Sequence, residues 1–385
     1  MRILVDARSL AEARGGVSRV TLRLITAYAQ SYPGDELVLA TTGRKKPALP
    51  EGLTALPNIT RVHIGWPNKL WSAACLFRLV SLVTAAEKMA GKTDTLFLPN
   101  IGFSGRWPKD RKTVLLLHDL SFLIEPRWFK QKQQWWHRLV GAEGSIRRAT
   151  RLLAVSETTK RDATKILGVD PESISVIPIG NTLMTEPSQP DLGIKRGDSP
   201  SRYCLALGLG DPRKNSRTAI EAIRALRKEK GYEDVGLILI CSGIKNNVIS
   251  SSSRNLPIGR SLRGACPVWN YGSRDDNFLK IFSSPTDDEL ASLYAHAAAF
   301  LYPSWYEGYG LPLHEAASFG TPCVAALAGA LPETAPKGTL FAHPAKPQHW
   351  VEAIKIATHL QKNRIEPDGT AWIKAAELLH AACEN

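Results

Sequence analysis

Short apolar runs alternate with longer segments of helical spacing along most of this chain. In the first half the runs are Arg2–Asp6, Glu36–Ala40, Ile59–Ile64, Thr95–Pro99, Thr113–His118 and Leu152–Ser156. Continuous apolar runs of four to eight residues are typical of strands buried on both faces, which occur in parallel sheets. Because parallel strands need crossover connections, the alternation predicts an α/β fold with sheets wound by helices.

A break in this alternation divides the chain. Residues 185–202 are rich in Pro, Ser, Asp and Gly and have no hydrophobic period, which is typical of a linker. A new series begins with Tyr203–Leu209 and continues through Val235–Ser242, Leu279–Ser283 and Ala297–Tyr302. The length of 385 residues suits two domains. We therefore predict a first domain over 1–184 and a second over 203–370, with an excursion at 243–278 that has no functional interpretation.

The net charge of +13 favours anionic partners, which include nucleic acid, anionic membranes and phosphorylated substrates. The six cysteines contain no C-x2-C pair, and we expect buried free thiols in a reducing compartment. The first residues lack the pattern of a signal peptide, so we expect a cytosolic protein. Leu70–Lys88 predicts one helix, and its most apolar part is interrupted by Arg78 and too short to span a bilayer.

Leu301–Ala326 carries the strongest chemical signal, because it holds Glu307 and Glu315 with seven residues between them. An apolar run leads into a loop with two glycines, and Pro312 then suits the first turn of a helix. Such a loop and helix N-terminus can hold a phosphate, while ionised carboxylates accept hydrogen bonds from hydroxyls. A sugar nucleotide offers both groups. The alternative is that both carboxylates are solvated surface groups.

Three other places have the composition of a ligand site, and each has a structural alternative. Gly15-Gly16 precedes a helix predicted over Arg19–Ser31, which indicates either a phosphate loop or a plain turn. His118-Asp119 follows a strand, at the edge where α/β folds bind ligands, but the pair also suits a helix cap and a structural histidine. Arg213-Lys214 follows another strand and can neutralise a diphosphate or lie in solvent.

Trp128–Arg151 interleaves aromatic with basic residues. This composition suits single-stranded nucleic acid, an anionic membrane surface, or a helix pair with buried tryptophans and a solvated basic face. No recognisable RNA-binding module accompanies it, so we expect no nucleic-acid partner. Gly208 and Gly210 lack the third glycine of the dinucleotide fingerprint, which makes a nicotinamide cofactor unexpected.

The string EGYGLPLHEAASFGTP resembles the E-x7-E signature of retaining glycosyltransferases of family 4. It matches both glutamates of the usual form E-G-F-G-L-P-x-L-E-A-x-x-x-G-x-P and departs from it at Tyr309 and His314. GLGDPRKN is similar to the family's G-T-x-E-P-R-K-N, VLLLHDL to its V-x-x-x-H-D-L, and Gly15, Gly16 and Arg19 to its G-G-I-x-R. Ile179 stands where the family often has Asn, in I-P-N-G.

The resemblance implies a GT-B fold, in which two Rossmann-like doubly wound domains face a central cleft and a last helix, here 371–385, returns to the first domain. It also implies roles for the matched residues. His118 and Glu307 would contact the donor sugar, and Glu315 the ribose. Arg213 and Lys214 would bind the donor diphosphate together with the amides of Gly308, Tyr309, Gly310 and Leu311. Gly15, Gly16 and Arg19 would contact the acceptor or a phosphate.

The activity implied by the resemblance is retaining transfer of a hexose from a nucleoside diphosphate sugar, with no metal and no cofactor. GDP-mannose is the first donor to expect and UDP-sugars the second. The acceptor would be a glycan or lipid-linked glycan of bacterial polysaccharide or lipopolysaccharide synthesis, used by a cytoplasmic enzyme that is peripheral at the inner membrane face. No Asp-x-Asp occurs, which argues against a metal-bridged GT-A enzyme.

Two alternatives stay open at this point. The chain could be another GT-B enzyme, such as a nucleotide-sugar epimerase or a phosphorylase, although no sequence signal marks the pyridoxal phosphate lysine of the latter. It could also be a non-enzymatic two-domain protein that clamps a phosphorylated ligand or nucleic acid. Turnover separates these classes, because a pure binder shows saturable binding without product.

Overall fold

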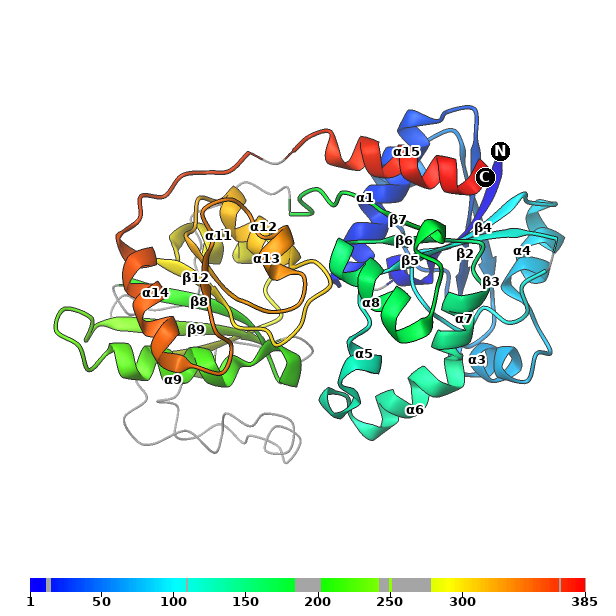
Figure 1. The fold of residues 1–385 in the computed structure, drawn as a ribbon. Helices are drawn as coiled ribbons and strands as arrows, with labels where there is room; N and C mark the ends of the chain where they lie inside the picture. Colours follow the sequence, from blue (N-terminus) through cyan, green and yellow to red (C-terminus); the bar gives the residue numbers. More distant parts are fainter. Residues whose placement is uncertain are drawn as a thin grey trace. The chain divides into compact units, whose positions relative to one another are not determined.

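The computed structural model describes residues 1–11, 15–108, 110–183, 202–241, 249–250, 278–366 and 368–384. The chain forms two compact units (Figure 1), one of Met1–Thr182 with Asp368–Asn385 and the other of Leu183–Pro367. Almost all of the predicted linker 185–202, and nearly all of the excursion at 243–278, lie outside the described residues.

The first unit is built on a sheet of seven parallel strands in the order β3-β2-β1-β4-β5-β6-β7. These strands are β1 (Arg2–Asp6), β2 (Glu36–Thr42), β3 (Ile59–Ile64), β4 (Thr95–Leu98), β5 (Lys112–Leu117), β6 (Arg151–Ala154) and β7 (Ile174–Val176). Val5 pairs with Leu39 on one side and with Phe97 on the other. The strand order therefore reverses between β1 and β4.

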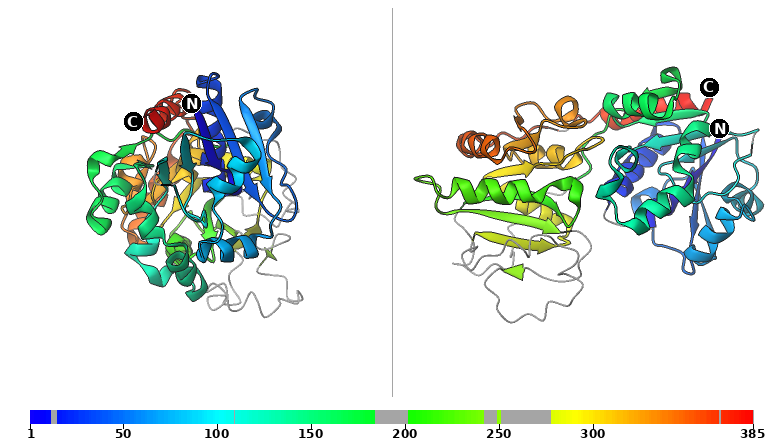
Figure 2. Two further views of the ribbon diagram at one scale, coloured as in Figure 1. Left: turned by 90° about the vertical axis from the view of Figure 1, so that its right-hand side faces the viewer. Right: turned by 60° about the horizontal axis from the view of Figure 1, so that its bottom comes forward.

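Helices cover both faces of this sheet (Figures 1 and 2). The α-helices are α1 (Gly16–Ser31), α2 (Glu51–Thr54), α3 (Asn68–Leu76), α4 (Leu82–Ala90), α5 (Ser121–Ile124), α6 (Gln131–Val140), α7 (Ala142–Arg148), α8 (Glu157–Leu167) and α15 (Ala371–Glu384), with 3-10 turns η1 (Ala7–Ala11), η2 (Pro126–Trp128) and η3 (Pro171–Ser173). The last helix, α15, packs against α1. Ser156 caps α8, since its side chain accepts a hydrogen bond from the Thr159 amide.

The single helix predicted over Leu70–Lys88 is wrong, because the structure divides it into α3 and α4. Arg78 takes a left-handed backbone with φ of 59°, which ends the first helix. Ser81 then caps the second, its side chain accepting from the Thr84 amide. The residues between the helices leave apolar side chains in solvent, with Phe77 72% and Leu79 76% exposed.

The second unit repeats this plan with seven strands in the order β10-β11-β9-β8-β12-β13-β14. They are β8 (Arg202–Leu209), β9 (Val235–Cys241), β10 (Ile249–Ser250), β11 (Leu279–Ser283), β12 (Ala299–Tyr302), β13 (Cys323–Ala326) and β14 (Leu340–Ala342). All neighbours are parallel except β10 and β11. The order reverses between β8 and β12, where Leu205 pairs with Phe300.

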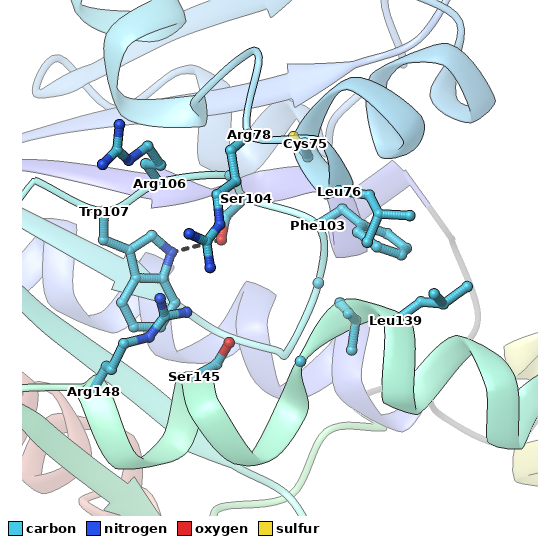
Figure 3. Close-up of a pocket in the computed structure, with 14 residues that line it drawn as sticks. Cys75, Leu76, Arg78, Phe103, Ser104, Arg106, Trp107, Leu139, Ser145 and Arg148 are labelled. Carbon is cyan, nitrogen blue, oxygen red and sulfur yellow. Dashed lines mark hydrogen bonds between the residues drawn. The ribbon is translucent and has the colours of Figure 1, made fainter.

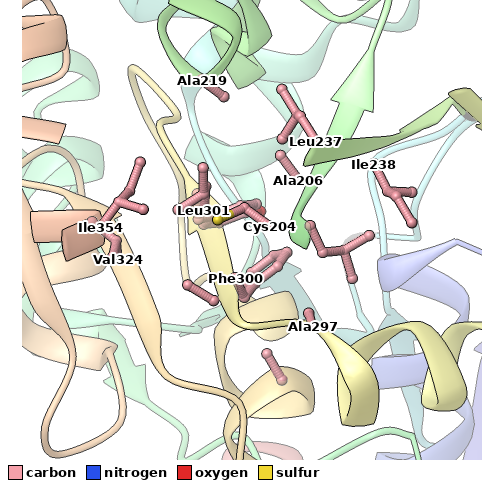
Figure 4. Packing of buried hydrophobic residues seen from close by; sticks show 14 of the residues in the cluster. Cys204, Ala206, Ala219, Leu237, Ile238, Ala297, Phe300, Leu301, Val324 and Ile354 are labelled. Carbon is pink, nitrogen blue, oxygen red and sulfur yellow. The ribbon is translucent and has the colours of Figure 1, made fainter. Parts of the chain in front are cut away.

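The helices of this unit are α9 (Ser216–Leu226), α11 (Asp287–His296), α12 (Leu311–Ser318), α13 (Leu331–Thr334) and α14 (Pro347–His359), with the 3-10 turn η4 (Pro212–Lys214). α9 packs against α14, and α11 against α12. The core between these layers is apolar and includes Cys204, Leu237 and Phe300 (Figure 4). The predicted doubly wound, Rossmann-like architecture is therefore confirmed.

Thr286 caps α11, and it forms a reciprocal pair of hydrogen bonds with Glu289. The prediction of buried free thiols holds for Cys75, Cys204, Cys241, Cys323 and Cys383. Burial raises the pKa of the Cys204 thiol to about 12, so it stays protonated and unreactive. Cys266 lies outside the described residues.

Candidate functional site

The strongest candidate site lies in the second unit, at the carboxyl ends of β8 and β12. These neighbouring strands are the ones between which the strand order reverses. Loops that leave a parallel sheet at such a point diverge to opposite faces and open a crevice, which is where α/β folds bind ligands. Arg213 and Lys214 follow β8, and Glu307 follows β12. The topology therefore brings together residues about ninety positions apart in the sequence.

Lys214 and Glu307 form a mostly buried ion pair. The Lys214 Nζ donates to Glu307 Oε1 at 2.7 Å and to the Tyr302 hydroxyl at 2.7 Å. The same Nζ lies 4.8 Å from the centre of the Tyr302 ring, which adds a cation–π contact. Two of the three ammonium hydrogens thus have acceptors among the described residues, and the third is available to a ligand oxygen.

Tyr302 belongs to this cluster although the sequence analysis did not single it out. It is the last residue of β12 and is buried, and burial raises the pKa of its hydroxyl well above the usual value. The hydroxyl therefore stays neutral and contacts Lys214 without adding charge. A polar residue at the carboxyl end of a predicted central strand was the available signal.

Arg213 lies beside this cluster on the turn η4. Its guanidinium contacts the Asp211 carboxylate, with Nη2 3.0 Å from Oδ2, and its amide donates to Asp211 Oδ1 at 3.0 Å. Asp211 therefore caps the turn and orients the arginine side chain at once. Arg213 and Lys214, which were predicted to neutralise a diphosphate, are thus both held on one short turn.

Asn215 fixes that turn to the rest of the site, and the sequence analysis gave it no role. It is buried in a left-handed conformation with φ of 50°. Its side-chain amide donates to the Pro303 carbonyl at 3.0 Å and to the Pro344 carbonyl at 2.9 Å. One side chain thus joins the loops that follow β8, β12 and β14. An Asn between a short turn and a segment of helical apolar spacing is a recognisable signal for such a residue.

Glycines make the close approaches in this site possible. A Cβ on Gly208 would lie 2.5 Å from the Lys214 Cβ, and its φ of +90° is unfavourable for other residues. Gly329 has the same role beside Glu307, because a Cβ there would lie 2.8 Å from the Glu307 backbone nitrogen. The residues of the ion pair are therefore packed directly against glycine backbone.

Gly310 and Leu311 form the start of α12, as the sequence predicts. Gly310 is the residue before the helix, with φ of 97° and ψ of 41°, and Pro312 occupies the first turn. Gly308 is buried in the loop that precedes it. This arrangement gives the loop and helix N-terminus that an anion requires, on the loop that also carries Glu307.

Glu315 points into the interior from the first turns of α12 and is only 4% exposed. The Tyr294 hydroxyl lies 3.4 Å from its Oε2. A buried carboxylate is costly unless polar groups surround it, so Glu315 is not the solvated surface residue of the structural alternative. The same conclusion holds for Glu307, which is 8% exposed.

Tyr309 and His314, the two residues that depart from the family motif, contact each other. The rings of Tyr309 and His314 stack at 4.9 Å with an interplanar angle of 16°. His314 Nε2 donates to the Thr334 carbonyl at 2.7 Å, and the Thr334 hydroxyl donates to the Tyr309 carbonyl. Burial raises the pKa of Tyr309 to about 12 and lowers that of His314. These residues form one neutral packed group beside the loop.

The remaining predicted site residues belong to the first unit. His118 follows β5, and its Nε2 lies 2.8 Å from the Pro99 carbonyl. A carbonyl can only accept, so Nε2 carries the hydrogen and Nδ1 is left as an acceptor. Burial lowers the pKa of His118, which keeps the ring neutral. Asp119 makes local contacts, because its Oδ1 accepts from the Ser121 amide at 2.9 Å and from the Ser121 hydroxyl at 2.6 Å.

Gly15, Gly16 and Arg19 lie at the start of α1. Gly15 is the residue before the helix, Gly16 begins it, and the Arg19 amide donates to the Gly15 carbonyl at 3.0 Å. A Cβ on Gly15 would meet nothing within 4 Å. Residues 12–14 of this loop lie outside the described residues. The first unit thus presents a glycine loop after β1 and a neutral histidine after β5.

The Trp-rich basic segment is exposed rather than packed. Trp135 is 61% and Trp136 40% exposed, and α6 buries none of its residues. The alternative with buried tryptophans is therefore wrong for this helix. Among the described residues, no three His, Cys, Asp or Glu side chains form a metal-binding group. In the same part of the chain, no helix has the length and apolar character needed to cross a bilayer.

Two curated relatives are mannosyltransferases. The chain is 30% identical over 208 residues to the MMP alpha-(1->4)-mannosyltransferase of Mycolicibacterium hassiacum, which covers 54% of this chain and 44% of that protein. It is 27% identical over 248 residues to the O-antigen chain mannosyltransferase RfbU of Salmonella typhimurium, and the match covers 64% of this chain and 61% of that protein. The matched part is therefore less than two thirds of these relatives' lengths.

Among solved structures, sucrose-phosphate synthase from Thermosynechococcus elongatus superposes with a TM-score of 0.67 at 17% identity, covering all of this chain and 94% of that one. A structural similarity at this low sequence identity shows that the fold is shared. Residues 14–181 match the family described as Glycosyltransferase Family 4, and residues 194–376 match the family described as Glycosyl transferases group 1. The ion-paired loops after β8 and β12 lie within the second match. The chain thus belongs to glycosyltransferase family 4 and has its two-domain GT-B fold.

Proposed function

We propose that this protein is a retaining, metal-independent glycosyltransferase that moves a hexose from a nucleoside diphosphate sugar to a glycan acceptor. The observation that carries the proposal is the Lys214–Glu307 pair, buried with Tyr302 at the topological switch point of the second unit. A mostly buried lysine with a free hydrogen, next to an arginine and a helix N-terminus, is a site for a diphosphate.

The proposed roles are those that the matched motif residues imply. Arg213, Lys214 and the loop Gly308, Tyr309, Gly310 and Leu311 hold the diphosphate, Glu315 the ribose hydroxyls, and Glu307 the sugar hydroxyls. Glu307 also keeps Lys214 in place, since they are 2.7 Å apart. From the first unit, His118 offers Nδ1 to a sugar hydroxyl, and Gly15, Gly16 and Arg19 line the acceptor side.

In the proposed reaction, the bond between the anomeric carbon and the diphosphate oxygen breaks, and its electron pair leaves with the nucleoside diphosphate. The acceptor oxygen forms its bond on the same face, and its proton passes to the departing phosphate oxygen. Fixed cations and amides at the leaving group stabilise the charge that grows there. Such electrostatic stabilisation usually contributes more to the rate than any other single effect.

GDP-mannose is the proposed donor, with UDP-sugars next, because both curated relatives described above carry the name of mannosyltransferases. The proposed acceptor is a lipid-linked glycan of bacterial polysaccharide or lipopolysaccharide assembly. The exposed Trp135 and Trp136, on a basic helix of a chain with net charge +13, support a peripheral position at the cytoplasmic face of the membrane.

The test is a thermal-shift panel of GDP, UDP, ADP and their sugar conjugates on the wild type, Glu315→Ala and Glu315→Gln. Glu352→Ala, an exposed glutamate of α14, is the matched control. We expect one nucleotide to stabilise the wild type and the control but neither Glu315 variant. Transfer or slow hydrolysis of that donor then distinguishes an enzyme from a binder. If no nucleotide binds while RNA or acidic vesicles do, the proposal is wrong.

A further inference from the structure

A pocket of about 420 Å³ lies in the first unit, and none of the residues that line it is assigned to the donor or the acceptor above. Its walls come from the end of α3, the loop after β4 and the junction of α6 with α7. This volume is within the range of small-molecule sites, which is about 300–1,000 Å³. The loops that follow β4 and β5 leave the carboxyl edge of the sheet, where ligands of α/β folds bind.

The pocket has a basic end. Arg78, Arg106 and Arg148 line it together with Trp107, and Figure 3 shows Arg78 and Arg148 reaching toward Trp107. The Arg148 guanidinium lies 5.1 Å from the centre of the Trp107 ring. Among the described residues, no carboxylate forms an ion pair with any of the three arginines. Three such guanidinium groups around one hollow repel each other and favour an anion that accepts several hydrogen bonds.

The other end of the pocket is apolar. Leu76, Phe103 and Leu139 lie there, on the side opposite Arg106 and Trp107 in Figure 3. Phe77 and Leu79, which continue this apolar edge along the chain, are among the most exposed hydrophobic side chains of the described residues. Exposing these apolar side chains to water is unfavourable. An apolar edge beside a basic hollow suits a ligand that carries a hydrocarbon part next to a negatively charged group.

Backbone contacts hold the pocket in this shape. Ser81 and Gly105 form an antiparallel bridge between the two loops, and the Leu82 amide donates to the Ser104 carbonyl at 2.9 Å. A Cβ on Gly105 would overlap the Val80 carbonyl, and φ there is +74°. The buried Trp71 donates from Nε1 to the Phe103 carbonyl at 3.1 Å. The pocket is thus preformed.

We propose that this pocket binds the phosphate or diphosphate group of an amphiphilic acceptor, with its hydrocarbon chain on the Leu76 and Leu139 side. The inference rests on the proposed function, because it names the class of acceptor that the glycosyltransferase would use. Guanidinium forks match phosphate oxygens in bidentate geometry, and the Trp107 ring keeps Arg148 in position for that contact.

The test measures binding of geranyl diphosphate, inorganic diphosphate and geraniol by calorimetry. We expect geranyl diphosphate to bind more tightly than either of the other two. Arg78→Gln and Arg148→Gln should each weaken its binding about tenfold or more, because each loses a charge-assisted hydrogen bond. Lys132→Gln, an exposed cation of α6, removes the same charge outside the pocket and should change the affinity less than about twofold.

Two further variants separate this site from the donor site. Lys214→Met should leave geranyl diphosphate binding intact, and Arg78→Gln should leave nucleotide binding intact. If binding of geranyl diphosphate is lost in Lys214→Met but kept in the arginine variants, the pocket inference is wrong while the proposed function stands. If no nucleotide binds but geranyl diphosphate still requires Arg78 and Arg148, the pocket is real and the proposed function is wrong.

Vesicles distinguish an acceptor from the membrane itself. Binding to vesicles with anionic phospholipids should fall no more in Arg78→Gln than in Lys132→Gln. A selective loss of vesicle binding in Arg78→Gln and Arg148→Gln, without binding of geranyl diphosphate to the wild type, would assign the pocket to a phospholipid headgroup and overturn the acceptor proposal.

Discussion

Lys214 shows how single residues make this site, because its side chain has defined neighbours along its length. The stem passes over Gly208, and the ammonium group contacts Glu307 and Tyr302. Breaking a buried ion pair costs far more than the pair contributes, since it leaves one charge alone in a poorly solvated place. Stability and the proposed binding of the diphosphate therefore depend on the same few contacts.

Gly208→Ala tests this packing. The new Cβ would lie 2.5 Å from the Lys214 Cβ at a φ of +90°. We expect a loss of about 2–4 kcal/mol in the free energy of unfolding and at least a tenfold loss of nucleotide affinity. Gly231→Ala has the same φ within a few degrees, at +88°, but an open surrounding, and should cost about 1 kcal/mol without affecting affinity. Urea unfolding measures the loss of stability, and calorimetry measures the loss of nucleotide affinity. Equal losses in Gly208→Ala and Gly231→Ala would contradict the packing argument.

His314 gives the second unit a predictable response to pH. Burial lowers its pKa in the folded state, so the unfolded chain binds the proton more readily. Stability is therefore full above about pH 6.5 and falls as the pH drops below that value. We expect His314→Leu to reduce the difference in unfolding free energy between pH 7.5 and pH 5.0, whereas His349→Leu, at an exposed position of α14, should leave it unchanged.

The helices and strands were largely predictable, because their apolar periods are long and regular. β1 and β11 have the predicted bounds. The helix predicted over 70–88 was wrong because the chain breaks between Arg78 and Ser81, and Ser81 there pairs with Gly105, on a loop distant in sequence. Tyr302 and Asn215 were missed for the same reason. Their roles come from partners 88 or more residues away.

Local motifs identify Glu307, Lys214 and Glu315 as candidates, and the structure adds that the first two are partners. Ile179 illustrates the opposite case. The residue replaces an expected Asn and is buried, next to a glycine that receives the last helix of the chain. No local pattern before Ile179 indicates that Trp372 will pack there.

The docking of α15 can be tested at Gly180. A Cβ on that residue would lie 2.5 Å from Trp372 Nε1, which donates to the Asn181 carbonyl at 3.2 Å. We expect Gly180→Ala to destabilise the first unit by about 1–3 kcal/mol and to speed hydrogen exchange in α15. Gly34→Ala meets nothing within 4 Å and is the control. Unchanged exchange in α15 would show that this contact does not hold the helix.

At the scale of the whole molecule, the proposed membrane role depends on charge and exposed aromatic surface together. In that proposal, the net charge of +13 attracts anionic lipid over about a Debye length, and the exposed tryptophans of α6 enter the interface. The segment 128–151 combines these features over a short part of the chain. Membrane binding should therefore depend on both salt and aromatic side chains.

We expect a Trp135→Ser and Trp136→Ser double variant to bind anionic vesicles at least about tenfold more weakly than the wild type, without loss of folding stability. Trp66→Ser, also an exposed tryptophan of the first unit, is the control. Raising the salt from about 0.05 to 0.5 M should weaken the wild type as well. Co-sedimentation with vesicles measures the effect of the substitutions and the effect of salt. Vesicle binding that depends neither on salt nor on Trp135 would contradict a peripheral membrane role.

The first unit contains both Met1–Thr182 and Asp368–Asn385, so the second unit is inserted within it along the chain. On the ribosome, the sheet of the first unit emerges early, but the helix that packs on α1 follows the whole second unit. At synthesis rates of about 5–20 residues per second, the surface of α1 that α15 covers waits roughly 10–40 s for its partner. The first unit thus begins to form before the second but is completed after it. A ribosome that stalls within the second unit leaves the apolar face of α1 uncovered, for chaperones to protect.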